Sequence, residues 1–91
     1  MKTQKLTFHC DPSHGWLEVP RADAIALGLA DKISPYSYMG GHSLYLEEDC
    51  DASLYLDAAK AAGYTLNITE RYTDSDSPIR NFDQYSNKAA V

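Results

Sequence analysis

Residues 43–63, SLYLEEDCDASLYLDAAKAAG, contain the tetrapeptide SLYL twice, with a cluster of acidic residues between the two copies. In the first copy the residue types alternate, so Leu44 and Leu46 share one face of a predicted strand and Tyr45 lies on the other face. In the second copy helical spacing applies, because Leu54 and Tyr55 are each followed by alanines three or four positions apart. This pattern predicts a helix that ends at Gly63. One tetrapeptide therefore has two structural roles, and the repetition is not a structural repeat.

The acidic residues between the copies are explained first by the change from strand to helix. The side chain of Asp49 or Asp51 can cap the helix, and the neighbouring negative charges favour the positive end of the helix dipole. Of the 13 acids in the chain, five lie between Ile33 and Ala59, where there is no Lys or Arg, and the other eight are balanced by eight bases. The segment therefore carries the whole net charge of −5. Its acids are Glu47, Glu48, Asp49, Asp51 and Asp57.

The N-terminal part of the chain predicts a hairpin. Residues 5–10, KLTFHC, alternate apolar and polar side chains, which is typical of a half-buried strand. The turn residues DPSHG follow at 11–15, and WLEV at 16–19 can return as the second strand, because five-residue loops that contain Gly are common between antiparallel strands.

A short helix is predicted next, from Pro20 to about Leu27. Proline suits the first position of a helix, because its missing N–H would have no partner there. Gly28 follows as a left-handed terminator. The predicted inner face comprises Ala22, Ile25, Ala26 and Leu29.

Three further strands complete the pattern. Residues 31–38, DKISPYSY, predict a strand in which Pro35 indicates an edge position or a bulge. Its hairpin partner is 43–48, across a loop at 39–42. Residues 64–73, YTLNITERYT, alternate again and predict the last strand. The inner face of that strand comprises Tyr64, Leu66 and Ile68.

These elements predict an α+β domain in the order ββαββαβ, with one mostly antiparallel sheet and two helices, most simply on one face of the sheet. The alternative is two hairpins packed as a small barrel. A chain of 91 residues has room for one domain, which we predict to span residues 1–73. Residues 74–91 are polar and are predicted to be a partly flexible tail, whose first half can be pinned to the domain by Ile79 and Phe82.

The composition argues against several classes of protein. Hydrophobic residues make up 44% of the chain and charged residues 23%, which is typical of a folded domain. No apolar run is as long as a membrane span or the core of a signal peptide, so we predict a cytoplasmic protein without a membrane partner. An acidic domain without a basic stripe is poorly suited to bind phosphates, so direct nucleic-acid binding is not expected. Cys10 and Cys50 are expected to be reduced thiols.

The residues that bear chemistry form no recognisable catalytic or metal-binding pattern. The acid cluster lacks the glycine and the alternate carboxylate spacing of a calcium loop. The zinc-type ligands show no CxxC or HxxxH spacing, and GxSxG, HExxH and a Gly-rich phosphate loop are absent from the sequence. We therefore predict no metal, no cofactor and no catalytic residue, and rank a metal-dependent enzyme third among the functions considered. The sequence leaves open whether the zinc-type ligands meet in space; they are His9, Cys10, His14, His42 and Cys50.

Tyrosine is abundant, with seven residues in 91. Tyrosine side chains offer a large contact area at low entropic cost and are enriched at interfaces. Three of them fall on the predicted central hairpin beside the acid cluster, and Tyr45 should point outward because Leu44 and Leu46 take the inner face. We predict that this acidic, tyrosine-rich surface binds a partner protein. Its residues are Tyr36, Tyr38, Tyr45, Glu47, Glu48, Asp49 and Asp51.

Two resemblances add expectations. Residues 8–63 resemble a family of small proteins carried by bacteriophages, prophages and plasmids, on the segments FHCDPSHGWLEVPR, GLADKISPYSY and SLYLEEDCDASLYLDAAKAAG. This resemblance implies an accessory protein of a mobile element, a setting in which small acidic domains often block a host defence such as CRISPR or restriction. Residues 17–34, LEVPRADAIALGLADKIS, are similar to the strand, short helix and strand of AbrB-like swapped-hairpin regulators, which dimerise and present basic residues to DNA. Here Arg21 and Lys32 stand against three acids, so the electrostatics disfavour that role.

The first hypothesis is therefore a non-enzymatic phage or plasmid protein that binds a host protein or complex through the acidic, tyrosine-rich surface and inhibits or modulates it. The negative charge can match that of nucleic acid in a basic groove. The alternative is a dimeric swapped-hairpin DNA-binding regulator. The sequence does not name the target, and it leaves monomer and homodimer both open.

Overall fold

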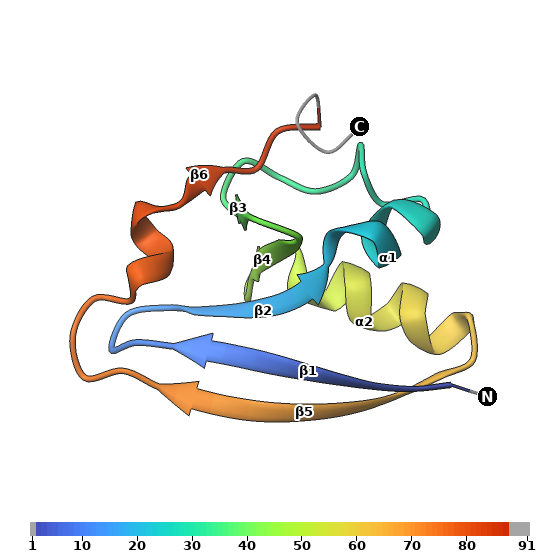
Figure 1. Cartoon of the computed structure of the whole chain (residues 1–91), viewed down its shortest axis with the longest axis horizontal. Coiled ribbons are helices and arrows are strands. Elements are labelled where there is room, and N and C mark those ends of the chain that lie inside the picture. The colour runs from blue at the N-terminus through green and yellow to red at the C-terminus, as the bar shows by residue number, and fades with distance from the viewer. Residues whose placement is uncertain (1, 88–91) are drawn as a thin grey trace.

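The computed structural model describes residues 2–87. Six strands form one open sheet in the order β5-β1-β2-β4-β3-β6, accompanied by two α-helices and a short 3₁₀ helix (Figure 1). The elements, in chain order, are β1 (Lys2–Cys10), β2 (Gly15–Pro20), α1 (Arg21–Ala26), β3 (Tyr38–Gly40), β4 (Ser43–Glu47), α2 (Ala52–Ala61), β5 (Tyr64–Tyr72), η1 (Pro78–Asn81) and β6 (Asp83–Gln84).

The predicted α+β fold class is confirmed. The strands and α-helices from β1 to β5 follow the order ββαββαβ, and the sheet is mostly antiparallel. The exception is β5, which runs parallel to β1 from the pair Lys2 and Tyr64 to the pair Cys10 and Tyr72. Since the sheet ends in two edge strands, β5 and β6, the alternative of two hairpins packed as a barrel is wrong. Within residues 2–87, no helix has the length and apolar character needed to cross a membrane.

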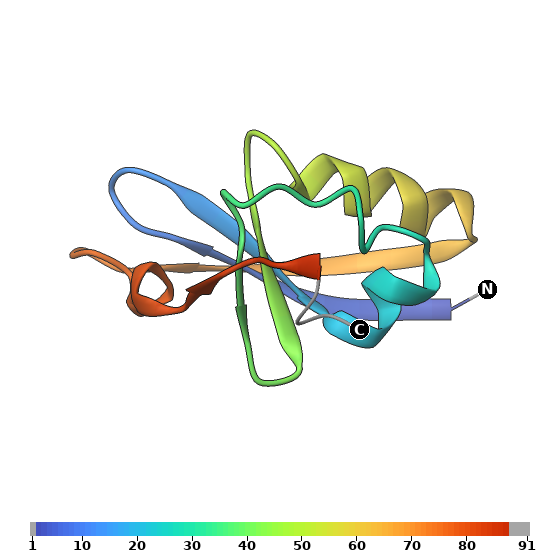
Figure 2. The ribbon, with the colours of Figure 1, turned by 90° about the horizontal axis from the view of Figure 1, so that it is seen from above.

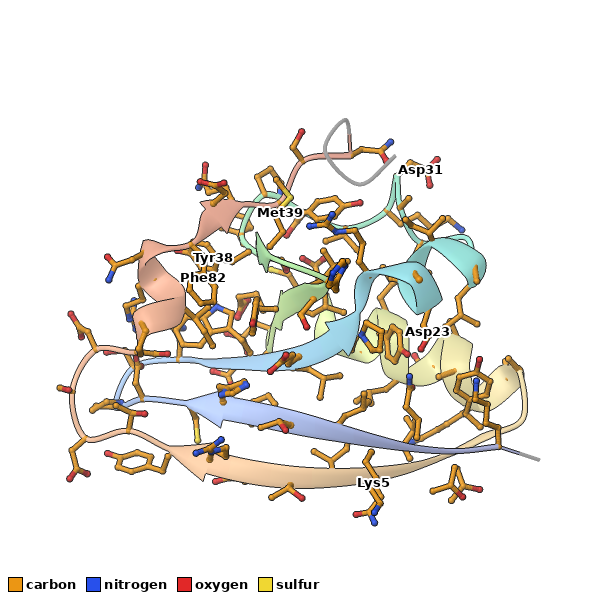
Figure 3. The ribbon with its side chains drawn as sticks, viewed as in Figure 1. Lys5, Asp23, Asp31, Tyr38, Met39 and Phe82 are labelled. Carbon is orange, nitrogen blue, oxygen red and sulfur yellow. The ribbon has the colours of Figure 1, made fainter. Side chains whose placement is uncertain are left out.

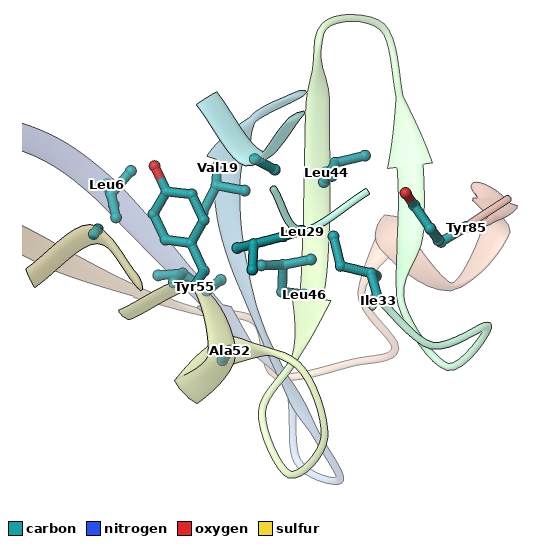
Figure 4. Packing of buried hydrophobic residues seen from close by; sticks show 12 residues of the cluster. Leu6, Val19, Leu29, Ile33, Leu44, Leu46, Ala52, Tyr55 and Tyr85 are labelled. Carbon is teal, nitrogen blue, oxygen red and sulfur yellow. The ribbon is translucent and has the colours of Figure 1, made fainter. Parts of the chain in front are cut away.

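One face of the sheet carries the aliphatic core. Leu17 on β2 pairs with Leu46 on β4, and Val19 pairs with Leu44. Because side chains alternate along a strand, this register gathers the apolar residues on one face. Leu44 and Leu46 are 1% and 0% exposed, which confirms the predicted inner face of β4. Both helices and the loop after α1 add to this core, which also includes Leu6, Ala24, Leu29, Ile33, Ala52, Tyr55, Ala59 and Tyr85 (Figure 4).

The sheet is strongly twisted. Seen from above, the β3–β4 hairpin runs across the direction of β1 and β5 rather than along it (Figure 2). Twist of one hand accumulates from strand to strand in a sheet of this width. The twist leaves α1 and α2 near one end of β1 and β2, while the segment after β5 reaches the other end (Figure 1).

Helix α1 turns a different side to the core than the sequence predicts. Ala24 is its buried residue, with 0% exposure. Pro20 is still paired within β2, and this fixes where the six-residue helix begins and which residues turn inward. Leu29 is buried as predicted, and the φ of 78° at Gly28 confirms the left-handed terminator. The predicted inner residues Ala22, Ile25 and Ala26 are exposed.

The segment before β3 corrects the prediction of a strand over residues 31–38. Only its last residue pairs in β3, and the rest forms turns held by a side chain from another part of the chain. The carboxylate of Asp51 accepts hydrogen bonds from the N–H and hydroxyl of Ser34 and from the hydroxyl of Ser37. The proline of the segment lies in one of these turns, not at an edge or a bulge. The hairpin loop correspondingly shortens to residues 41–42.

Helix α2 begins where predicted but is not capped as predicted. Asp51 occupies the N-cap position, yet its side chain makes no cap hydrogen bond. The loop before β3 supplies several donors at once, so the carboxylate turns inward to them and is 3% exposed. The C-terminal end agrees with the sequence, because Gly63 follows the helix with a φ of 91°.

The inner face of β5 is only partly as predicted. Tyr64 and Leu66 are half-buried against the core, but Ile68 is 43% exposed. Since β5 is an edge strand with one neighbour, less of it is covered than of the central strands.

Residues after 73 add two elements that the sequence did not predict. Strand β6 pairs with β3, and Ile79 in η1 and Tyr85 after β6 are 4% and 6% exposed. Burial of Ile79 agrees with its expected role as an anchor, and Phe82 is half-buried. The last four residues of the predicted tail, 88–91, lie outside the described residues.

Candidate partner-binding site

The face of the sheet opposite the aliphatic core is aromatic. By the alternation of strands, Trp16 on β2, Tyr38 on β3 and Tyr45 on β4 direct their side chains to this face. The rings of Trp16 and Tyr38 meet edge to face with 6.2 Å between centroids, and Phe82, after η1, packs on Tyr45 at 5.0 Å. Tyr38 and Phe82 are labelled in Figure 3. The C-terminal segment therefore covers one part of the aromatic face.

An open hollow of about 390 Å³ lies on this face beside the covered part. Four residues of the predicted partner-binding set line it, namely Tyr36, Tyr38, Glu47 and Asp49. Tyr36 is 70% exposed and is the most exposed large hydrophobic side chain among the described residues. The hollow also includes Cys50, which lies within the acid cluster, and three residues that were not predicted beside it, namely His14, Trp16 and Arg80. We call this site the acidic aromatic hollow.

Hydrogen bonds fix the acidic wall of the hollow. Glu47 ends β4, where it pairs with Trp16 on β2. Its N–H donates to the hydroxyl of Ser37 at 2.9 Å, and its carboxylate accepts from the N–H of Asp49 at 2.9 and 3.1 Å. The chain therefore turns directly after β4 and holds two carboxylates beside the aromatic rings.

An ion pair between a buried aspartate and a half-buried arginine closes the opposite side of the hollow. The guanidinium of Arg80 donates to the carboxylate of Asp11 at 2.7 and 3.0 Å and lies over the Trp16 ring at 5.1 Å from its centroid. Asp11 is 5% exposed and also accepts from the N–H of Ser77 at 2.9 Å. The hydrogen bond from Arg80, helped by backbone N–H donors, holds the pKa of the Asp11 carboxyl well below its usual range. Because Asp11 neutralises Arg80, the net charge of the hollow comes from Glu47 and Asp49.

Tyr45 has the predicted orientation but a different environment. It lies on the face opposite Leu44 and Leu46, yet Phe82 and His9 pack against its ring, the latter at 5.9 Å. Burial is the main cause that raises the pKa of Tyr45. Tyr45 therefore lines a neighbouring hollow of about 330 Å³ and not the acidic aromatic hollow.

The remaining two residues of the predicted partner-binding set, Glu48 and Asp51, differ in solvent exposure. Glu48 is exposed at the rim, next to the acidic wall. Asp51 is interior, because Ser34 and Ser37 occupy its carboxylate. Asp51 therefore shapes the loop that carries Tyr36 and is left out of the contact surface.

The zinc-type ligands do not converge on one point. His9 bonds to Glu18 at 2.8 Å, and Cys10 and Cys50 are separate free thiols. The pKa of Cys10 is raised chiefly by desolvation and that of Cys50 chiefly by a hydrogen bond to Glu47. His14 instead joins the acid cluster, since potential ligand atoms of four residues lie within 4.8 Å of one another. These four are His14, Glu47, Glu48 and Asp49.

The neighbours that sequence reasoning missed follow from strand order. When β2 pairs with β4, the turn before β2 comes beside the turn after β4, so His14 and Trp16 meet Glu47. The available signal was the short loop between β1 and β2, because β2 is the strand that pairs with the hairpin. Arg80 carried no comparable signal, because its partner Asp11 is 69 residues away in the sequence.

Comparison of the chain with protein-family models, with curated proteins and with solved structures gave no match. The resemblances to mobile-element proteins and to swapped-hairpin regulators therefore stay predictions. The case for a function rests on the geometry of the hollow.

Proposed function

We propose that this chain is a non-enzymatic accessory protein of a bacteriophage or plasmid, which binds a host protein in the bacterial cytoplasm and inhibits or modulates it. The observation that supports this proposal is the acidic aromatic hollow, in which the exposed Tyr36 stands beside the carboxylates of Glu47 and Asp49. Exposed aromatic side chains at the centre of a concave surface are the usual anchors of protein interfaces.

The chemistry of the hollow favours a basic partner surface. A lysine or arginine side chain in the hollow would contact the rings of Tyr36 and Tyr38 and the carboxylate of Asp49. The chain contains its own example of such a contact, because the guanidinium of Arg80 stacks over Trp16 in the same hollow. A host protein that presents arginine or lysine to nucleic acid offers the complementary charge.

Binding is favoured over catalysis by the state of the thiol in the hollow. A cysteine reacts as its thiolate, and thiolates form where positive charge lowers the thiol pKa. Here the pKa of Cys50 is raised by Glu47, by desolvation and by further acids nearby. This environment keeps the thiol protonated and weakly nucleophilic.

The alternative of a swapped-hairpin DNA-binding regulator has less support. Its resemblance covers residues 17–34, which form the end of β2, helix α1 and a loop, and not two strands around a helix. The charges of that stretch also oppose contact with phosphates. A shift of duplex DNA at low salt by the purified chain would favour the regulator.

Affinity capture from a bacterial lysate tests the proposal. We expect the wild-type chain to retain one or more host proteins, and Tyr36→Ala with Asp49→Asn to lose them. The matched control is Ile25→Ala with Asp57→Asn, which removes an exposed apolar side chain and one charge from the two helices. Equal retention by the hollow variant and the control would refute binding through the hollow.

A further inference from the structure

Strand β5 is a long edge strand, at the opposite end of the sheet from β6 (Figure 1). It spans Tyr64–Tyr72 and pairs along its whole length with β1, while no strand among residues 2–87 pairs with its outer side. An unpaired edge presents backbone N–H and C=O groups that can template another strand.

The hydrogen-bond pattern identifies which backbone groups point outward. Thr73, directly after β5, donates its N–H to the carbonyl of Cys10 in β1 at 2.9 Å. Because successive residues of a strand direct their backbone groups to alternate sides, odd-numbered residues face β1 and even-numbered residues face outward. The outward set is therefore Tyr64, Leu66, Ile68, Glu70 and Tyr72.

This edge lacks the features that usually prevent strand pairing. The sequence of β5, YTLNITERY, contains no Pro and no Lys, and its two charges, Glu70 and Arg71, have opposite signs. Two of the four exposed large hydrophobic side chains of the described residues lie on it, with Ile68 at 43% and Tyr72 at 61% exposure. By contrast, the other edge strand, β6, has two residues.

The register of β5 is self-complementary about Ile68. In an antiparallel pair centred there, Ile68 of each copy faces its equivalent and the two exchange both backbone hydrogen bonds. Tyr72 of one copy then lies opposite Tyr64 of the other, on the face of the sheet that carries α2. The pairing thus covers Ile68 and Tyr72, the two exposed apolar side chains of the strand. It gives the contact no net charge, because each copy contributes one acidic and one basic residue.

We propose that two copies of this chain associate through antiparallel pairing of β5, which joins their sheets into one continuous sheet with two-fold symmetry. The acidic aromatic hollow lies on β2, β3 and β4, so both hollows stay open in the dimer. This inference rests on the edge strand alone and does not depend on the proposed function.

Sedimentation equilibrium over a range of concentrations tests the dimer. Ile68→Lys places like charges opposite each other at the symmetry axis, and Ile68→Pro removes an N–H that makes no bond to β1. Ile25→Lys is the matched control, because Ile25 on α1 is 42% exposed. We expect the wild type and the control to reach twice the monomer mass, and both Ile68 variants to stay monomeric with an unchanged circular dichroism spectrum.

Two outcomes would overturn the proposal. One is a wild-type chain that stays monomeric up to its solubility limit, which would leave the edge for a strand of another protein. The other is a dimer that Ile68→Lys does not weaken relative to Ile25→Lys, which would place the interface elsewhere. Slowed amide exchange at Ile68 and Glu70 at high protein concentration would locate the contact on β5.

Discussion

Asp49 and Asp51 lie two positions apart and have opposite surroundings. Asp51 is 3% exposed, and its carboxylate accepts hydrogen bonds from the backbone and hydroxyl of Ser34 and from the hydroxyl of Ser37 at 2.5 Å. Asp49 is exposed in the wall of the hollow. An interior carboxylate matched by donors is costly to alter, whereas a solvated one is not. We therefore assign Asp51 to stability and Asp49 to partner binding.

Replacement of each aspartate by asparagine tests this assignment. Asp51→Asn puts an NH₂ group against hydroxyl and N–H donors, so we expect the free energy of unfolding to fall by about 2 to 4 kcal/mol. Asp49→Asn should leave the urea midpoint unchanged. Equal midpoints for the two variants would contradict the interior role of Asp51.

At the scale of elements, η1 is attached to the rest of the chain through the buried side chain of Ile79 and through an ion pair. Arg80 lies in the last turn of this short helix, and its guanidinium donates a hydrogen bond to the carboxylate of Asp11 in the turn between β1 and β2. The backbone of Ser77 adds a hydrogen bond to the same carboxylate. The attachment holds the C-terminal segment against the aromatic face and completes the hollow.

The ion pair predicts that the stability of the fold depends on pH. The folded-state pKa of Asp11 is depressed, so its contribution to stability is complete above the unfolded pKa, about 3.9, and is lost as the pH falls toward the folded pKa. Arg80→Met keeps an apolar stem over Trp16 but removes the charge. We expect this variant to be less stable than the wild type at pH 7, with a difference that narrows below about pH 4. Urea unfolding at pH 7, 5 and 3 measures it, and a difference independent of pH would contradict the role of the pair.

The elements differ in how far local sequence determines them. The alternation at Leu44 and Leu46 was sufficient to predict the inner face of β4, and Gly63 was sufficient to predict the end of α2. Strand faces and helix ends depend on neighbours in the sequence. Residues 31–38 were mispredicted because their hydrogen bonds go to Asp51. The two elements after residue 73 were missed because η1 is bonded to Asp11 and β6 pairs with β3, both far away in the sequence. Where a distant side chain supplies the partner, periodicity carries no signal.

The candidate site was predictable to a similar extent. Tyr36, Tyr38, Glu47 and Asp49 were placed together from their proximity on one hairpin, and they do line one hollow. The opposite side of the hollow, formed by Trp16 and Arg80, requires the strand order and the fold of the C-terminal segment. Tyr45 was assigned the correct face of β4, but the ring that covers it comes from residue 82.

On the scale of the whole molecule, β1 separates the free edge strand β5 from β2, the nearest strand of the hollow. Association through β5 would therefore present two hollows on one particle. A dimer can engage two sites of a partner at once, and the second contact then forms at the high effective concentration that the first creates. Pairing through β5 and binding in the hollow are independent, so each can be lost without the other.

The central claim, that the hollow binds a basic partner surface, is tested most directly by titration of an arginine-rich peptide while the fluorescence of the single tryptophan, Trp16, is recorded. We predict a saturable change for the wild type that weakens with added salt. Tyr36→Ala with Asp49→Asn should lower the affinity about tenfold or more, since one cation–π contact and one charge are lost. The control Ile25→Ala with Asp57→Asn should match the wild type. A wild type that shows no saturable change, or a hollow variant that binds as tightly as the control, would contradict the account.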